Sequence, residues 1–352
     1  MSHFCLLSKP DQYVAHDWDM LTDVAARNHW LELFDKHFQE VLKSASTQYG
    51  RTSGKQVMTA RAEFAEVIKG LRENPAGLPS GKLNIIELCR AREAVLRKHR
   101  LNDPFGHIKK RENELAASIY PAAVKKLHAM EGPAKWLHLI ECVFAGNLFD
   151  LGAPMVMHMA DKPMDFLSAV ENTKPRPWLI DDFDTLLKDL PSTPPVKWAK
   201  AVVFIDNAGS DFILGIMPLV RELALSGTKI VLAANELPSL NDMTADETVA
   251  VVERLAAVDA DLAALLQADM FEVVSTGNDI PLIDLSNVSD ELNAAAADAD
   301  LVIIEGMGRA VESNLDAQFK VDTLWLALLK DTAVAERVNG QVYDCICKYK
   351  PV

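Results

Sequence analysis

Apolar residues recur at the three- and four-residue spacing of amphipathic helices from about residue 18 to residue 160. Runs typical of strands are nearly absent from this part of the chain. Glycine and proline interrupt the pattern at 74–81, 102–106 and 131–133, as residues that end helices do. We therefore expect a mainly α-helical N-terminal domain over residues 1–165, with helices near 18–46, 55–73, 84–100, 108–130 and 133–146.

A different pattern begins near residue 200, where short apolar runs alternate with helical segments. Strands are predicted at 201–206, 229–234, 271–275 and 301–305. Their central runs VVFI, IVLAA, FEVV and LVIIE are largely apolar at consecutive positions, which is typical of strands that helices cover on both faces. This alternation predicts an α/β fold with a mostly parallel, doubly wound sheet. Further helices are predicted at 211–226, 245–267, 288–297 and 322–338, a last strand at 341–347, and one helix near 179–190 within the connector 161–198.

Polar residues and glycines directly follow four of the predicted strands. Asp206 and Asn207 end the first strand, Asp242 lies shortly after the second, and Glu305 ends the fourth. Ligands of open α/β sheets collect beyond the carboxyl ends of parallel strands, so these side chains are expected at one edge. Asp206, Asn207 and Asp242 offer the oxygen ligands that Mg²⁺ and Mn²⁺ prefer. The alternative is that Asp206 and Asn207 cap the next helix. The additional carboxylate of Glu305 at the same edge favours a metal site.

Phosphate-binding groups are predicted beside these carboxylates. Gly209 and Ser210 open a helix whose N–H groups can hold an anion, and Arg309 follows a glycine-rich turn. For Lys320 the alternative is a solvated helix lysine, and for Asn147 it is a helix cap. The predicted substrate contacts are Gly209, Ser210, Asn147, Asp150, Glu305, Gly306, Met307, Gly308, Arg309 and Lys320.

Composition narrows the class of protein further. The 352 residues carry a formal net charge of −14, which argues against a nucleic-acid partner. No window approaches 18 consecutive apolar residues, so a membrane partner is not expected. The five cysteines are scattered and odd in number, which fits a cytoplasmic protein. Cys345 and Cys347 alternate with other residues as in a strand and lack the usual zinc-site spacing.

Several spaced motifs together resemble those of the metal-dependent damage-control phosphatases, a family long labelled domain of unknown function 89. They are FIDNAGSD, LAANELPSLND, STGNDIPLIDLS, EGMGR and YDCICKYK, with DPFGHIKKREN and FAGNLFDLGA in the helical half. The resemblance is strongest to the second subgroup, marked by EGMGR. That subgroup includes stand-alone plant proteins and the C-terminal domain of the fourth vertebrate pantothenate kinase isoform.

This resemblance implies a Rossmann-like three-layer α/β/α domain, here over residues 166–352, and a divalent metal such as Mn²⁺, Mg²⁺, Co²⁺ or Ni²⁺. The implied metal ligands map to Asp206, Asn207 and Asp242, of which the two aspartates are also the expected catalytic residues. The implied reaction is hydrolysis of a phosphate monoester, namely 4′-phosphopantetheine and its oxidised or damaged forms in the coenzyme A pathway. The expected partner is thus a small phosphorylated metabolite, and assembly into homo-oligomers stays open.

Two questions of mechanism and class stay open at this point. Either water attacks phosphorus or Asp206 does so and forms an aspartyl phosphate. Ala208 stands where a second acid would be expected for the aspartyl route, which favours water. The alternatives to this substrate are sugar phosphates or related metabolites, a non-catalytic sensor of a phosphorylated metabolite, and a carboxyl methyltransferase. The candidate metal ligands Asp206, Asn207 and Asp242 argue against a sensor, which would not require them. A methyltransferase is disfavoured because no glycine-rich fingerprint follows the first strand.

Overall fold

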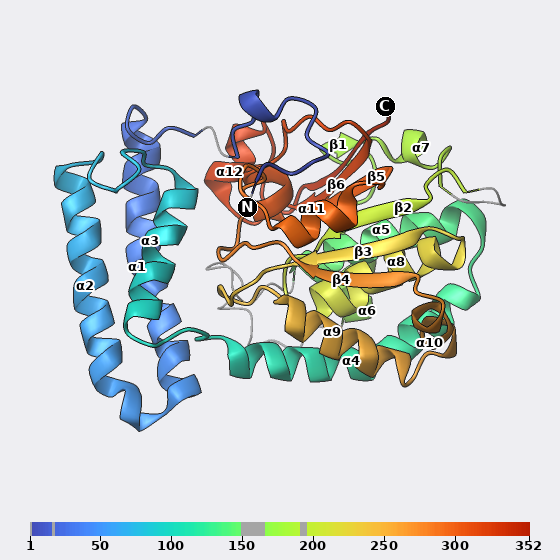
Figure 1. Cartoon of the computed structure of the whole chain (residues 1–352), viewed down its shortest axis with the longest axis horizontal. Helices are drawn as coiled ribbons and strands as arrows, with labels where there is room; N and C mark the ends of the chain where they lie inside the picture. The colour runs from blue at the N-terminus through green and yellow to red at the C-terminus, as the bar shows by residue number, and fades with distance from the viewer. Residues whose placement is uncertain (1, 16–17, 149–165, 191–195) are drawn as a thin grey trace.

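A seven-stranded sheet forms the centre of the protein, as Figure 1 shows for the computed structural model. The structure describes residues 2–15, 18–148, 166–190 and 196–352. The strand order is β1-β7-β6-β5-β2-β3-β4, and every neighbouring pair is parallel except β6 and β7. The predicted mostly parallel sheet is confirmed. The strands are β1 Ile180–Asp181, β2 Lys200–Phe204, β3 Lys229–Ala234, β4 Phe271–Ser275, β5 Leu301–Glu305, β6 Asp322–Leu328 and β7 Cys345–Lys350.

Both faces of the sheet are buried, which explains the unbroken apolar runs of its strands. Along β2, Val202 and Phe204 point into one core, while Ala201 and Val203 point into the other. All four side chains are fully buried. Successive residues of a strand face opposite sides, so a strand that is covered on both sides has no position for a polar residue.

Helices and the N-terminal segment supply the two covering layers. One core contains residues of α4, α5, α8, α9 and α10, and the other contains residues of α11, α12 and the bundle of α1, α2 and α3. The bundle stands to one side of the sheet in Figure 1. The helices are α1 Val24–Tyr49, α2 Gly54–Glu73, α3 Ile85–Lys98, α4 Gly106–His128, α5 Gly132–Leu148, α6 Phe166–Glu171, α7 Phe183–Leu186, α8 Met217–Leu225, α9 Ala245–Ala256, α10 Ala260–Gln267, α11 Asp290–Ala296 and α12 Thr332–Arg337. Short helical turns are η1 Pro10–Gln12, η2 Arg51–Ser53, η4 Asp211–Ile216 and η5 Met307–Glu312.

The predicted domain boundary at residue 165 stays a prediction. Parts of the N-terminal half pack directly on the sheet. Helices α4 and α5 pack on the sheet, and they share a core with β2. The first residues of the chain also join the α/β part, because Phe4 N donates to Leu285 O at 2.8 Å. Within the described residues, no helix is long and apolar enough to cross a membrane.

The predicted helix over 322–338 is wrong, because its first part is β6. This strand is buried along its whole length and pairs with β5 on one side and β7 on the other. A short apolar run fits a buried strand and a buried helix equally well, so only pairing partners distinguish them. The predicted helix near 179–190 likewise divides into β1 and α7, and the last strand begins at Cys345, four residues later than predicted.

Candidate metal and phosphate site

The carboxyl ends of β2, β3 and β5 bring the predicted acidic residues together. Asp206 and Asn207 follow β2, Glu305 ends β5, and Asp242 lies in the loop after β3. These strands are neighbours in the sheet, so their ends meet at one edge. All four side chains are buried, with no more than 6% of their surface exposed. The sheet edge therefore carries a concentration of negative charge inside the protein.

Two of these carboxylates, Asp206 and Glu305, form a close triad with Asp211. Oxygens of Asp206, Asp211 and Glu305 all lie within 4.8 Å of one another. Asp211 comes from η4, a π-helical turn, and its Oδ2 accepts hydrogen bonds from the backbone and the side chain of Asn207 at 3.3 and 2.9 Å. Gly146 of α5 permits this arrangement, because a Cβ there would lie 2.9 Å from the Cα of Asp211. Such turns are often found at functional sites.

The triad needs a positive charge or a proton. Burial raises the pKa of Glu305 well above its usual range, and the neighbouring carboxylates of Asp211 and Asp206 raise it further. Glu305 Oε2 and Asn147 Oδ1 are buried and have no hydrogen-bond partner. Both are hard oxygen ligands of the kind that divalent cations prefer. The residues present thus fit a divalent metal, although they do not identify which one.

The predicted ligands Asp206, Asn207 and Asp242 all line one cavity of about 140 Å³. The backbones of Asn207 and Asp242 pair as an isolated antiparallel bridge, and Met243 N donates to Asp206 O at 2.9 Å. These contacts fix the loop after β3 against the end of β2. Asp206 thus belongs both to this cavity-lining set and to the triad behind it.

Arg309 lies among these carboxylates rather than in the flexible turn that the sequence suggested. Its Nε donates to Asp206 Oδ1 at 2.8 Å, and its Nη2 donates to Asp242 Oδ2 at 2.6 Å. The guanidinium is fully buried. The phosphate contact of Arg309 stays a prediction, and in the structure this residue pairs with two candidate metal ligands.

Gly306 also contributes to the position of Asp206. A Cβ at Gly306 would overlap Asp206 Oδ2, and the backbone φ of Gly306 is +94°, a conformation that glycine tolerates best. Met307 and Gly308, which follow it, line the same cavity as Asp206. Within the EGMGR motif, Gly306 therefore allows a close approach of Asp206, Met307 and Gly308 line the cavity, and Arg309 forms ion pairs.

Two more predicted phosphate contacts have structural partners that change their role. Asn147 is fully buried, and its Nδ2 donates to Asp211 Oδ1 at 2.7 Å and also to Glu305 Oε1. Glu305 itself belongs to the acidic triad, where a carboxylate would repel phosphate. Their phosphate contacts stay predictions, and in the structure Asn147 and Glu305 shape the acidic cluster.

The predicted anion-binding turn is not free to act as proposed. The backbone N–H of Gly209 donates to Asn113 Oδ1 at 2.7 Å, so this donor is already used. Ser210 precedes η4 and is half-buried, and it does not line the cavity. Asp150 lies outside the described residues.

The predicted cation Lys320 lies at the wrong end of the sheet. It precedes β6, and its Nζ donates to Cys5 O at 2.8 Å. The seven residues of β6 span roughly 20 Å and separate Lys320 from the cluster. Lys330, just beyond the other end of β6, is buried, lines the cavity, and donates from Nζ to Asn147 O at 3.2 Å. The incorrect helix prediction over 322–338 concealed this lysine.

The bundle forms the opposite wall of the cavity. Trp30 and Phe34 of α1 and Arg92 of α3 line it, with the Arg92 guanidinium 5.7 Å from the centre of the Phe34 ring. The cavity thus lies between an apolar helical wall and a charged sheet edge. Such a site can hold a metal and an anion at one side and apolar groups at the other.

Comparisons with known proteins agree with this geometry. The family model described as "Damage-control phosphatase ARMT1-like domain" matches residues 26–346. A damage-control phosphatase of Arabidopsis thaliana is 42% identical over 83% of this chain and 80% of its own length. A 4′-phosphopantetheine phosphatase of Mus musculus is 31% identical over 98% of this chain, which spans 48% of that protein. A pantothenate kinase 2 of Oryza sativa subsp. japonica is 37% identical over 99% of this chain, which spans 41% of that protein.

A solved structure shows the same fold. The crystal structure of a DUF89 family protein from Pyrococcus horikoshii aligns with a TM-score of 0.62 and 18% identity, and it covers 90% of this chain and 96% of that one. The motifs, the fold and the family match therefore agree. The chain belongs to the damage-control phosphatase ARMT1-like family, as its sequence motifs predicted, and is a phosphatase of that family.

Proposed function

We propose that this phosphatase uses a divalent metal to hydrolyse 4′-phosphopantetheine and its oxidised or damaged forms. The observation that supports the metal most directly is the cavity that Asp206, Asn207 and Asp242 line together, with the acidic triad behind it. The substrate is supported by the similarity to the mouse 4′-phosphopantetheine phosphatase, which extends over 98% of this chain.

Asp206, Asn207 and Asp242 would hold the metal, with Asp211 and Glu305 as the layer behind them. When bound, Mg²⁺, Mn²⁺, Co²⁺ or Ni²⁺ supplies positive charge for the phosphate and activates water. Arg309 keeps Asp206 and Asp242 at fixed positions through its two short hydrogen bonds. Lys330 supplies a second positive charge at the cavity wall, where it would bind phosphate oxygens.

The hydrogen bonds of Asp206 favour attack by water over attack by its own carboxylate. Its Oδ1 accepts from Arg309 at 2.8 Å and its Oδ2 accepts from Asn207 at 3.0 Å. A carboxylate held at both oxygens is well placed as a ligand but poorly placed to approach phosphorus. We therefore propose direct, in-line hydrolysis, in which water forms the new P–O bond and the alcohol leaves with a proton.

A cytoplasmic location is part of this proposal. All five cysteines are free thiols, and four of them are buried. Free thiols are typical of proteins in a reducing compartment.

Phosphate release from 4′-phosphopantetheine tests the proposal. The assay compares added Mg²⁺, Mn²⁺, Co²⁺ and Ni²⁺ with a chelator, and the wild type with Asp206→Ala, alongside sugar phosphates and nucleotides. We expect metal-dependent release that the variant loses, with 4′-phosphopantetheine as the preferred substrate. Preference for a sugar phosphate would change the substrate, and no release from any compound with metal bound would favour a sensor.

A further inference from the structure

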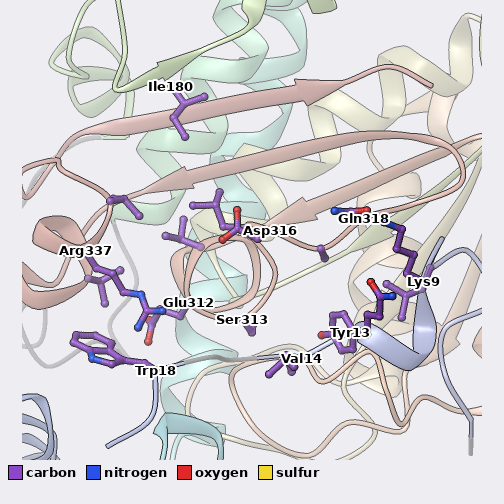
Figure 2. Close-up of a pocket in the computed structure, with 18 residues that line it drawn as sticks. Lys9, Tyr13, Val14, Trp18, Ile180, Glu312, Ser313, Asp316, Gln318 and Arg337 are labelled. Atoms are coloured by element: carbon purple, nitrogen blue, oxygen red, sulfur yellow. The ribbon is translucent and has the colours of Figure 1, made fainter. Parts of the chain in front are cut away.

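A second and larger cavity lies beside η5. It has a volume of about 570 Å³, and its walls come from the N-terminal segment, the stretch after η5, β1 and α12, as Figure 2 shows. Binding sites for small molecules commonly measure about 300 to 1,000 Å³. The second cavity has this size, whereas the cavity at Asp206 has only about 140 Å³.

One residue is part of the lining of both cavities. Glu312, the last residue of η5, lines both of them. In Figure 2, Glu312 lies with Trp18 and Arg337 at one end of the larger cavity, and Lys9 and Gln318 lie at the other end. The larger cavity therefore begins beside the metal and phosphate site and extends away from it.

The walls of the larger cavity suit an uncharged, elongated group. Two cations, Lys9 and Arg337, and two carboxyl groups, those of Glu312 and Asp316, are part of this lining. The remaining lining is largely apolar, with two side-chain amides. These residues include Leu7, Ile180, Val311, Leu315, Val334, Val338, Gln12 and Gln318.

We infer that the larger cavity holds the uncharged, amide-bearing arm of the substrate whose phosphate lies at Asp206, so that one molecule extends past Glu312 into both cavities. This inference rests on the proposed function. 4′-Phosphopantetheine has the required division, since its phosphate is at one end and its arm carries two amides and a terminal thiol. The wall amides of Gln12 and Gln318 offer donors and acceptors for such groups.

Filling the larger cavity tests the inference. Val338 is half-buried and lines only this cavity, so Val338→Trp would obstruct the arm. We expect the ratio of kcat/KM for 4′-phosphopantetheine to kcat/KM for p-nitrophenyl phosphate to fall at least tenfold. Gln12→Trp, at an exposed position, provides a second variant with little risk to folding. Leu115→Trp, on the exposed surface of α4, is the matched control and should leave the ratio unchanged.

In the alternative arrangement, the arm of the substrate would lie along α1 in the smaller cavity. Leu33 is also half-buried, but it lines only the smaller cavity. A tenfold fall in the ratio for Leu33→Trp, with no change for Val338→Trp and Gln12→Trp, would overturn the inference. Equal loss of both substrates in every tryptophan variant would overturn it too, because the arm would then make no separate contribution.

Calorimetric titration with pantetheine, which lacks the phosphate, gives a readout that does not depend on turnover. We expect the wild type to bind pantetheine, Val338→Trp to bind it at least tenfold more weakly, and pantetheine to compete with 4′-phosphopantetheine in the assay. Binding without competition would show a separate regulatory site and overturn the inference. If neither phosphate ester is hydrolysed, the proposed function fails, whereas the titration still decides whether the cavity takes the arm.

Discussion

Two clusters of buried charge in this protein differ in how completely their polar atoms are paired. The first surrounds Arg221, which is fully buried and donates to Asp259 at 2.6 and 3.1 Å, to Glu222 at 2.7 Å and to Asp261 at 2.6 Å. Tyr120 donates to Asp259 at 3.1 Å. Within the described part of the chain, no buried side-chain nitrogen or oxygen of this cluster lacks a partner.

The second cluster, at the sheet edge, is incomplete. Arg309 and Lys330 face the four carboxylates of Asp206, Asp211, Asp242 and Glu305. Buried atoms without a hydrogen-bond partner remain at Arg309 Nη1, Glu305 Oε2 and Asn147 Oδ1. Native proteins rarely leave buried polar atoms unpaired without a reason. The comparison teaches that the Arg221 cluster pairs its buried polar atoms within the protein, whereas the sheet-edge cluster leaves three of them unpaired.

The strongest test of this difference substitutes one aspartate in each cluster. We expect Asp206→Asn to lower kcat/KM for 4′-phosphopantetheine by roughly 10³-fold or more, because Asp206 belongs to both candidate ligand sets. Asp259→Asn is the matched control and should keep kcat/KM within about twofold per folded molecule. Equal loss of activity in the two variants would contradict a functional division between the clusters.

We expect substitutions in the Arg221 cluster to lower the stability of the protein more than they lower its activity. Arg221→Met removes the only arginine from a complete cluster and leaves Asp259 buried without it, so we expect a loss of about 3 to 5 kcal/mol in the free energy of unfolding. Urea unfolding measures this loss, and Mg²⁺ should not recover it. Arg309→Met should also lose stability, but Mg²⁺ should recover part of it, because a cation can replace the missing charge. Equal recovery in both variants would remove the distinction.

The sequence alone was sufficient to locate three of the strands. The predicted ranges 229–234, 271–275 and 301–305 agree with β3, β4 and β5 at both ends, and a polar residue or glycine directly follows each of them. The range 322–338 was predicted wrongly although Lys330 and Asp331 interrupt it, because the short apolar run before them fits a helix and a strand equally well. Only the pairing of β6 with β5 and β7 identifies it as a strand.

The site residues, like the strands, could be predicted only where the local sequence indicates them. Asp206, Asn207 and Asp242 were found because strand ends of a parallel sheet meet at one edge. Asp211 is not among the predicted ligands, because an aspartate in the first turn of a helix already has a local explanation. Its role depends on Asn147, 64 positions earlier in the chain, whose side chain donates to it. No local pattern carries that contact.

Lys330 and Lys320 provide a test of intermediate size. We expect Lys330→Met to lower kcat/KM by roughly 100-fold, because it removes one of two positive charges from the sheet-edge cluster. Lys320→Met should have no effect on kcat/KM, since its Nζ contacts the carbonyl of Cys5 at the opposite end of β6. A loss of activity with Lys320→Met alone would restore the sequence-based assignment.

The smallest expected effect is a difference in how the two clusters respond to pH. Burial and the carboxylates of Asp211 and Asp206 raise the pKa of Glu305, and burial with Asp331 raises that of Glu312 to about 8. Burial opposes ionisation of Asp259 as well, but hydrogen bonds from Arg221 leave its pKa lowered. A raised carboxyl pKa contributes stability below its unfolded value and loses it as pH rises through the folded value. A lowered pKa contributes stability above the unfolded value and loses it in acid.

The metal-free protein should therefore become less stable between about pH 5 and about pH 8, by roughly 1 kcal/mol or more, which thermal unfolding detects as a shift of a few degrees in Tm. Glu305→Gln should reduce this slope, because the amide stays neutral throughout and resembles the protonated acid. Asp259→Asn should leave the slope unchanged, since Asp259 is ionised across the whole range. Saturating Mg²⁺ should also flatten the slope of the wild type. If the metal-free wild type and Glu305→Gln show the same slope, Glu305 does not hold the extra proton, and the sheet-edge cluster must balance its charge within the protein as the Arg221 cluster does.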